Sequence, residues 1–143
     1  SKCGFSFTNE DIENILSFCL PHGCYIIENS STKRIVSTMM ARHLSSSKYP
    51  FGGRIDWLAT DPEYRKLGLG VICATAATKR LVDAKYENIR VTTDDERIGA
   101  IKIFLSIGFE YSLGELMYFV LGHGNLKGMF NNNATEMKLN GKI

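Results

Sequence analysis

The stretch ATDPEYRKLGLG, residues 59–70, decides the fold of this chain. It follows residues 54–60, which are expected to form a strand, and precedes residues 71–86, whose apolar residues recur at helical spacing. Asp61-Pro62 ends the strand, because proline cannot donate to a sheet ladder. The segment is therefore expected to be a turn that joins a strand to a long helix.

This turn has the properties of a phosphate-binding site. The first backbone N–H groups of a helix have no partner inside it, and they lie at the positive end of the helix dipole. Gly68 and Gly70 lack a Cβ, so a diphosphate can approach the backbone, and Arg65 and Lys66 add positive charge. A solvated loop with two turn glycines is an equally good interpretation of this segment alone, since short Gly-x-Gly matches are common by chance.

Two common nucleotide-binding motifs fail on spacing. A Rossmann fingerprint needs a third Gly or Ala where this chain has Cys73, and it must begin at the end of the strand. A Walker loop needs Gly-Lys-Ser/Thr after the glycines, where Val71-Ile72 stand here. A nucleotide-binding domain of another kind is kept as a third functional hypothesis.

Length and composition indicate one globular domain. The chain has 143 residues, 44% of them hydrophobic, and a formal net charge of +2, too mild for a dedicated nucleic-acid binder. No apolar run approaches the roughly 20 residues that span a membrane. Four cysteines without a CxxC pair and three scattered histidines give no zinc-ligand spacing. We expect no metal, no membrane contact, reduced thiols and a cytoplasmic location.

The periodicity predicts a mixed α/β (α+β) domain over residues 1–121. Thr8 and Asp11 resemble a capping box that opens a helix at 8–20, which Pro21 and Gly23 should stop. The further expected elements are a hairpin of 24–28 and 34–43, strands at 54–60, 88–93 and 115–121, and helices at 71–86 and 97–107. Gly108 should be a left-handed cap. Residues 122–143 are expected to be a polar C-terminal tail or to add a terminal strand.

Arg65-Lys66-Leu67-Gly68-Leu69-Gly70 resembles the acyl-CoA signature of the GNAT superfamily of N-acetyltransferases, Arg/Gln-x-x-Gly-x-Gly/Ala. Residues 92–109, a strand and helix closed by Gly108-Phe109, resemble the second cofactor-side motif of that family. The two motifs together cover about residues 54–110. The resemblance implies a mostly antiparallel central sheet with two splayed parallel strands and with helices on both faces.

The resemblance also implies that acetyl-CoA binds as co-substrate where the strands at 54–60 and 88–93 splay apart. The pantetheine amides would meet the backbone of the first strand, and the pyrophosphate would lie on the turn. The residues implied in cofactor binding are Leu58, Ala59, Thr60, Arg65, Lys66, Leu67, Gly68, Leu69, Gly70, Arg97 and Phe104.

The implied reaction is direct transfer of acetyl to a primary amine of a small molecule or peptide, with both substrates bound together. The amine must lose a proton, and Asp56 is the candidate to take it. The two-residue period of a strand would place Asp56 on the face of Leu58, and Trp57 on the opposite face, in the core. Alternatively, Asp56 is tied up by Arg54 or solvent.

Two departures from the family pattern keep a second function open. Phe104 stands where relatives commonly carry the Tyr that protonates the departing thiolate, so water, Tyr111 or Tyr118 would have to serve. Arg54 stands where they often carry Glu. A noncatalytic acyl-CoA-binding or regulatory module is therefore the alternative, and a homodimer is plausible because a splayed sheet exposes edges.

Three other features have both a functional and an ordinary structural interpretation. Residues 94–96 are acidic and either favour the next helix N-terminus or form a lip for a cationic amine. His43 could face the acceptor but is more often a surface residue. Cys73 lies where a thiol pKa could fall, yet it is expected to be a packing residue.

Overall fold

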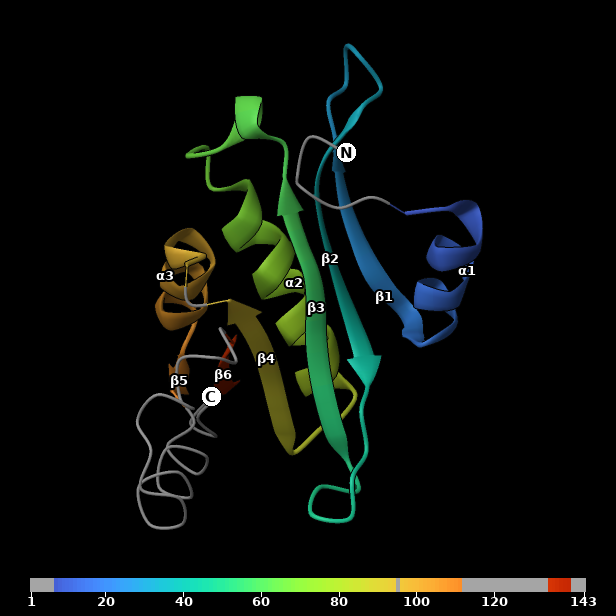
Figure 1. The fold of residues 1–143 in the computed structure, drawn as a ribbon, viewed down its shortest axis with the longest axis vertical. Helices are drawn as coiled ribbons and strands as arrows, with labels where there is room; N and C mark the ends of the chain where they lie inside the picture. Colours follow the sequence, from blue (N-terminus) through green and yellow to red (C-terminus); the bar gives the residue numbers. More distant parts are fainter. Residues whose placement is uncertain (1–6, 95, 112–133, 140–143) are drawn as a thin grey trace.

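The computed structural model describes residues 7–94, 96–111 and 134–139, and its centre is one six-stranded sheet (Figure 1). The strand order is β1-β2-β3-β4-β6-β5. Only β3 and β4 pair in parallel, and every other neighbouring pair is antiparallel, as expected from the sequence. The strands are β1 (Cys19–Glu28), β2 (Ile35–His43), β3 (Gly52–Thr60), β4 (Asn88–Asp94), β5 (Phe109–Tyr111) and β6 (Ala134–Leu139).

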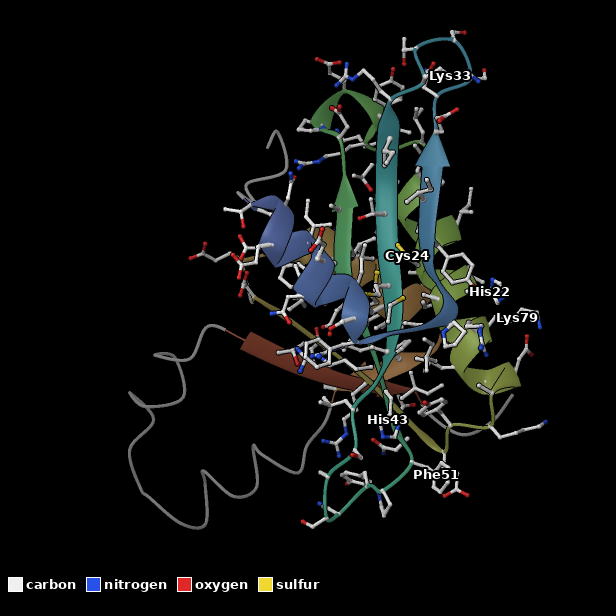
Figure 2. All side chains as sticks on the ribbon, turned by 90° about the vertical axis from the view of Figure 1, so that its right-hand side faces the viewer. His22, Cys24, Lys33, His43, Phe51 and Lys79 are labelled. Atoms are coloured by element: carbon white, nitrogen blue, oxygen red, sulfur yellow. The ribbon has the colours of Figure 1, made fainter. Side chains whose placement is uncertain are left out.

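Helices cover both faces of the sheet. The α-helices are α1 (Asn9–Ser17), α2 (Leu69–Asp83) and α3 (Ile98–Ser106), and a 3-10 turn, η1 (Pro62–Tyr64), follows β3. Figure 2 shows α1 on the opposite side of the strands from α2. The core lies between α2 and the sheet, where Ala74, Ala77 and Leu81 of α2 are fully buried against Ala41 and Ile55. Small alanines let the helix lie close to the strands.

The expected helix at 8–20 is shorter than predicted, because α1 ends at Ser17 and β1 begins at Cys19. Pro21 and Gly23 lie inside β1 rather than stopping the helix, so that prediction is wrong. The β1–β2 register shifts between Cys19 and Cys24, and β1 is an edge strand. Proline is tolerated at such an edge irregularity, since its missing N–H breaks no regular ladder.

The chain after α3 turns back through Gly108, whose φ of 95° confirms the predicted left-handed cap. The short β5 that follows was not predicted. The strand predicted at 115–121 lies outside the described residues. Ala134–Leu139, in the segment expected to be a tail or an extra strand, forms β6 between β4 and β5.

The capping box of α1 has a measurable electrostatic signature. Thr8 N–H donates to Asp11 Oδ2 at 2.8 Å, and Thr8 Oγ1 accepts from Asp11 N–H at 3.1 Å. The Thr8 backbone and then its hydroxyl lower the pKa of Asp11, so the stabilisation is present at neutral pH and is lost as pH falls through that lowered pKa. In Thr8→Ala we expect the Asp11 pKa to rise part of the way to its ordinary value, because the backbone donor remains. An NMR titration of the Asp11 carboxyl carbon measures it, and an unchanged pKa would contradict the assignment.

Candidate functional site

The strands β3 and β4 separate at the middle of the sheet. Their parallel pairing covers Gly52–Asn88, Gly53–Ile89 and Arg54–Arg90 and ends there. β3 nevertheless continues to Thr60 and β4 to Asp94, and the two arrows in Figure 1 diverge toward their C-terminal ends. The predicted splay between these strands is confirmed. It leaves the β4-facing edge of β3 without a strand partner in the described part of the chain.

A β-bulge in β3 lies at this opening. Met40 pairs with Asp56 but Thr38 pairs with Ala59, so β3 has one residue more than β2 in this interval. Trp57 takes the left-handed conformation there, with φ of 62°. A bulge of this kind reverses the alternation of the side chains that follow it.

The bulge overturns two predictions about β3. Trp57 is 38% exposed and packs edge-on against Phe7, with ring centroids 5.1 Å apart, so it is not a core residue. Asp56 and Leu58 lie on opposite faces. The Asp56 carboxylate is on the α1 side, whereas Leu58 Cδ1 lies 3.7 Å from the position of a Cβ on Gly70 of α2.

A cavity of about 710 Å³, which we call the turn cavity, lies beside the turn that joins β3 to α2. The end of β3 and the N-termini of α2 and α3 form its walls. Its lining comprises Leu58, Ala59, Thr60, Tyr64, Arg65, Lys66, Gly68, Leu69, Gly70, Val71, Glu96, Arg97, Ile98, Gly99, Ala100 and Ile103. Two helix N-termini and three cationic side chains against one carboxylate make this cavity favourable for an anion.

The two glycines of the turn have different structural roles. Gly68 is the N-cap of α2 with φ of 78°, and a Cβ there would meet nothing within 4 Å. A Cβ on the buried Gly70 would lie 2.8 Å from Ile103 Cδ1. Gly68 therefore sets the backbone conformation that opens space above the helix N-terminus, and Gly70 lets α3 approach α2.

Polar contacts hold the turn against the sheet. The Asp61 carboxylate, 8% exposed, accepts from Arg34 Nη2 at 2.8 Å, and Asp61 N–H donates to the Val36 carbonyl at 2.9 Å. Arg65 Nε donates to the Thr60 carbonyl at 3.2 Å, so this side chain also closes the turn. The sequence did not indicate Arg34, because no local pattern places a side chain of the β1–β2 hairpin beside the turn.

A second cavity of about 480 Å³, which we call the α1 cavity, lies between α1 and the splayed strands. It shares Leu58, Arg97 and Ala100 with the turn cavity, so the two meet at the splay. Its other lining residues are Asn14, Ile15, Phe18, Met39, Met40, Arg42, Arg54, Ile55, Asp56, Trp57, Val91, Thr92, Thr93, Asp94 and Phe104.

Asp56 is held between two arginines in the wall of the α1 cavity. Its Oδ2 accepts from Arg42 Nε at 2.5 Å and its Oδ1 accepts from Arg54 Nε at 2.7 Å. The carboxylate is 12% exposed. The alternative in which Arg54 ties up Asp56 is thus seen, with Arg42 as a second partner that the sequence did not reveal. The role of Asp56 as a base stays a prediction.

Two of the residues implied in cofactor binding lie outside the lining of the turn cavity. Leu67 is 65% exposed and lines neither cavity. Phe104 is buried, packs on Phe109 with ring centroids 5.8 Å apart, and lines the α1 cavity instead. Arg97 lines both cavities, and its Nε lies 2.6 Å from Asp94 Oδ2. This ion pair partly neutralises the acidic segment.

The remaining candidates lie apart from both cavities. His43 Nδ1 lies 3.1 Å from the Tyr86 hydroxyl, and Figure 2 shows it at the end of β2. Cys73 is a core residue, as predicted, and burial raises the pKa of its thiol rather than lowering it. Tyr111 is 49% exposed on β5, and Tyr118 lies outside the described residues.

Within ranges 7–94, 96–111 and 134–139, no cluster of three or more His, Cys, Asp or Glu could hold a metal ion. None of the helices in the same ranges is long and apolar enough to cross a membrane.

Comparisons with known proteins agree with this geometry. A family model described as the Acetyltransferase (GNAT) family matches residues 3–109. No curated protein matches in sequence. The NatC complex bound to Gag peptide and CoA is similar in structure, with a TM-score of 0.73, 17% identity and coverage of 96% of this chain and 84% of that one. Ard1 from Thermoplasma volcanium has a TM-score of 0.68 and 16% identity, with coverage of 96% of this chain and 82% of that one. A GNAT-family acetyltransferase from Staphylococcus aureus Mu50 has a TM-score of 0.64 and 21% identity, with coverage of 92% of this chain and 77% of that one.

Proposed function

Because the chain belongs to the GNAT acetyltransferase family, whose model spans residues 3–109, we propose that it moves an acetyl group from acetyl-CoA to a primary amine. The observation that carries the proposal is the splay of β3 from β4 beyond Arg54, with the turn cavity opening beside it. The NatC complex, similar in structure, is a protein with CoA bound. The open edge of β3 and the turn suit acetyl-CoA, and the second cavity across the splay suits an acceptor amine that meets the thioester there.

The residues of the turn cavity fit acetyl-CoA. The open space over Gly68 and the N–H groups at the start of α2 suit a pyrophosphate, with Lys66 and the free part of the Arg65 guanidinium beside it. The unpaired edge of β3 from Leu58 to Thr60 suits the pantetheine amides, as an added strand would. The thioester would then lie at Leu58, which borders both cavities.

The proposed chemistry is direct transfer without a covalent enzyme intermediate. The amine nitrogen attacks the thioester carbonyl carbon, a C–N bond forms, and the C–S bond breaks as the CoA thiolate leaves. The proton that the amine loses passes to Asp56, directly or through water, and water returns a proton to the thiolate. Phe104 has no hydroxyl to donate, but a thiol with a pKa near 8.5 is a tolerable leaving group without a dedicated acid.

The acceptor would enter from the α1 cavity, because that cavity reaches the splay from the other face of the sheet. Asn14 and Ile15 of α1 and Phe18, which follows the helix, form its outer wall, and α1 buries none of its residues. A small molecule or the end of a peptide fits a cavity of about 480 Å³ with such a wall.

The proposal is tested by calorimetry together with a thiol-release assay over a panel of amines. We expect CoA to bind and to outcompete NAD and ATP, and at least one amine to raise thiol release well above the background hydrolysis of acetyl-CoA. CoA binding without any amine-dependent release would support the noncatalytic module instead. Failure of CoA to bind at saturating concentration would reject both functions.

A further inference from the structure

We propose that the acceptor amine carries a carboxylate, and that Arg42 and Arg54 bind this carboxylate in the α1 cavity. The inference rests on the proposed acetyl transfer and names the substrate class of the same site. It starts from a pair of like charges that the fold places side by side.

Arg42 of β2 and Arg54 of β3 are directly opposite each other in the antiparallel register. Like charges at opposed positions destabilise a sheet. Both side chains are largely buried, 23% and 28% exposed, and both line the α1 cavity. Among the described residues, Asp56 is the one carboxylate paired with them, so one positive charge is in excess in this part of the cavity wall.

The two guanidinium groups keep most of their donors for a ligand. Each offers five N–H groups, and Asp56 takes only the Nε of each. The side chains of these two arginines make no other hydrogen bond or ion pair among the described residues. A guanidinium binds a carboxylate through two parallel N–H groups, so an incoming carboxylate suits the unused donors.

Asp56 also holds the arginines in place before a ligand arrives. Because each Nε is fixed at 2.5 or 2.7 Å from a carboxylate oxygen, both guanidinium groups are held against Asp56, Arg42 from the neighbouring strand and Arg54 from the same strand. Such preorganisation lowers the entropy cost of binding. Arg42, Arg54 and Leu58 all line the α1 cavity, so one acceptor can place its carboxylate at the arginines and its amine at the splay.

Among the described residues that line the α1 cavity, the other charged side chains are paired with each other. Asp94 and Arg97, at the β4 side of the α1 cavity, pair with each other at 2.6 Å. The lining of the α1 cavity also includes apolar side chains, among them Ile15, Phe18 and Trp57. An acceptor with a short hydrocarbon chain between its amine and its carboxylate matches this arrangement.

The test compares amino carboxylates, from glycine to γ-aminobutyrate, with their neutral methylamides. For the natural chain we expect kcat/KM to favour the best carboxylate about tenfold or more over its methylamide, through KM. Arg54→Gln and Arg42→Gln should each reduce that preference about tenfold, measured as the ratio of the two kcat/KM values, in which any effect on the Asp56 base cancels. Arg54→Lys keeps the positive charge but loses the pair of parallel N–H donors, so it should retain part of the preference for the carboxylate.

Two controls separate binding of the carboxylate from general damage. Affinity for CoA should not change in either glutamine variant, because neither arginine lines the turn cavity. Arg80 of α2 donates to the Pro21 carbonyl of β1 and lines neither cavity. Arg80→Gln should therefore leave the preference for the carboxylate unchanged.

Equal kcat/KM for carboxylates and methylamides would overturn the inference and leave the proposed acetyl transfer standing. If no amine is acetylated, the proposed transfer fails, and calorimetry with the CoA-saturated protein still decides the inference. Tighter binding of γ-aminobutyrate than of its methylamide, lost in Arg54→Gln, would support the carboxylate site, and equal binding would reject it.

Discussion

Asp56→Asn is expected to lower kcat for acetyl transfer about 100-fold, the effect typical of losing a general base. Most amine acceptors are protonated at neutral pH and must lose a proton for the nitrogen to attack. Each carboxylate oxygen of Asp56 accepts from one arginine and keeps a second lone pair for the acceptor amine or a bridging water. Steady-state rates at saturating acetyl-CoA and acceptor measure the effect.

The affinity for CoA serves as the internal control for Asp56→Asn, because Asp56 does not line the turn cavity. Asp83→Asn is the matched variant, since that carboxylate pairs with Lys79 on α2 outside both cavities and should leave kcat unchanged. If Asp56→Asn binds CoA normally and keeps its kcat, Asp56 is only the counter-ion of Arg42 and Arg54, and the amine proton leaves through water.

Gly68→Val is expected to weaken CoA binding about tenfold or more, as measured by calorimetry. A left-handed residue with a Cβ costs about 1–2 kcal/mol, and a β-branched side chain is the least tolerant of it. The new side chain would enter open space at Gly68, so the loss comes from the backbone leaving φ of 78°. That movement redirects the N–H groups at the start of α2 away from the anion.

Gly108→Val is the matched control for this prediction. Gly108 also has a left-handed φ, 95°, but it follows α3 and lines neither cavity. Both variants should lose thermal stability, and only Gly68→Val should lose affinity for CoA. Equal affinities in the two variants would show that the Gly68 turn does not hold the pyrophosphate.

The sequence alone placed the parts of the site that neighbouring residues specify. Asp61-Pro62 ends β3, Gly68 begins α2 in the left-handed conformation, and Gly108 ends α3 in the same region of φ. These features follow from proline's missing N–H and glycine's missing Cβ. The turn between β3 and α2, where most of the residues proposed to bind the cofactor lie, was therefore predictable from the sequence.

Only the tertiary structure decided which side chains line the same cavity. The bulge at Trp57 arises from the register between β2 and β3, so a strict period of two put Asp56 and Leu58 on the same face when they lie on opposite ones. Arg42 meets Asp56 for the same reason, fourteen residues away in sequence but adjacent across the strands. Backbone preferences depend on a few neighbouring residues, so a short stretch of sequence reveals them. Strand register is set by the packing of the whole sheet against α2, so it depends on residues far apart in the sequence.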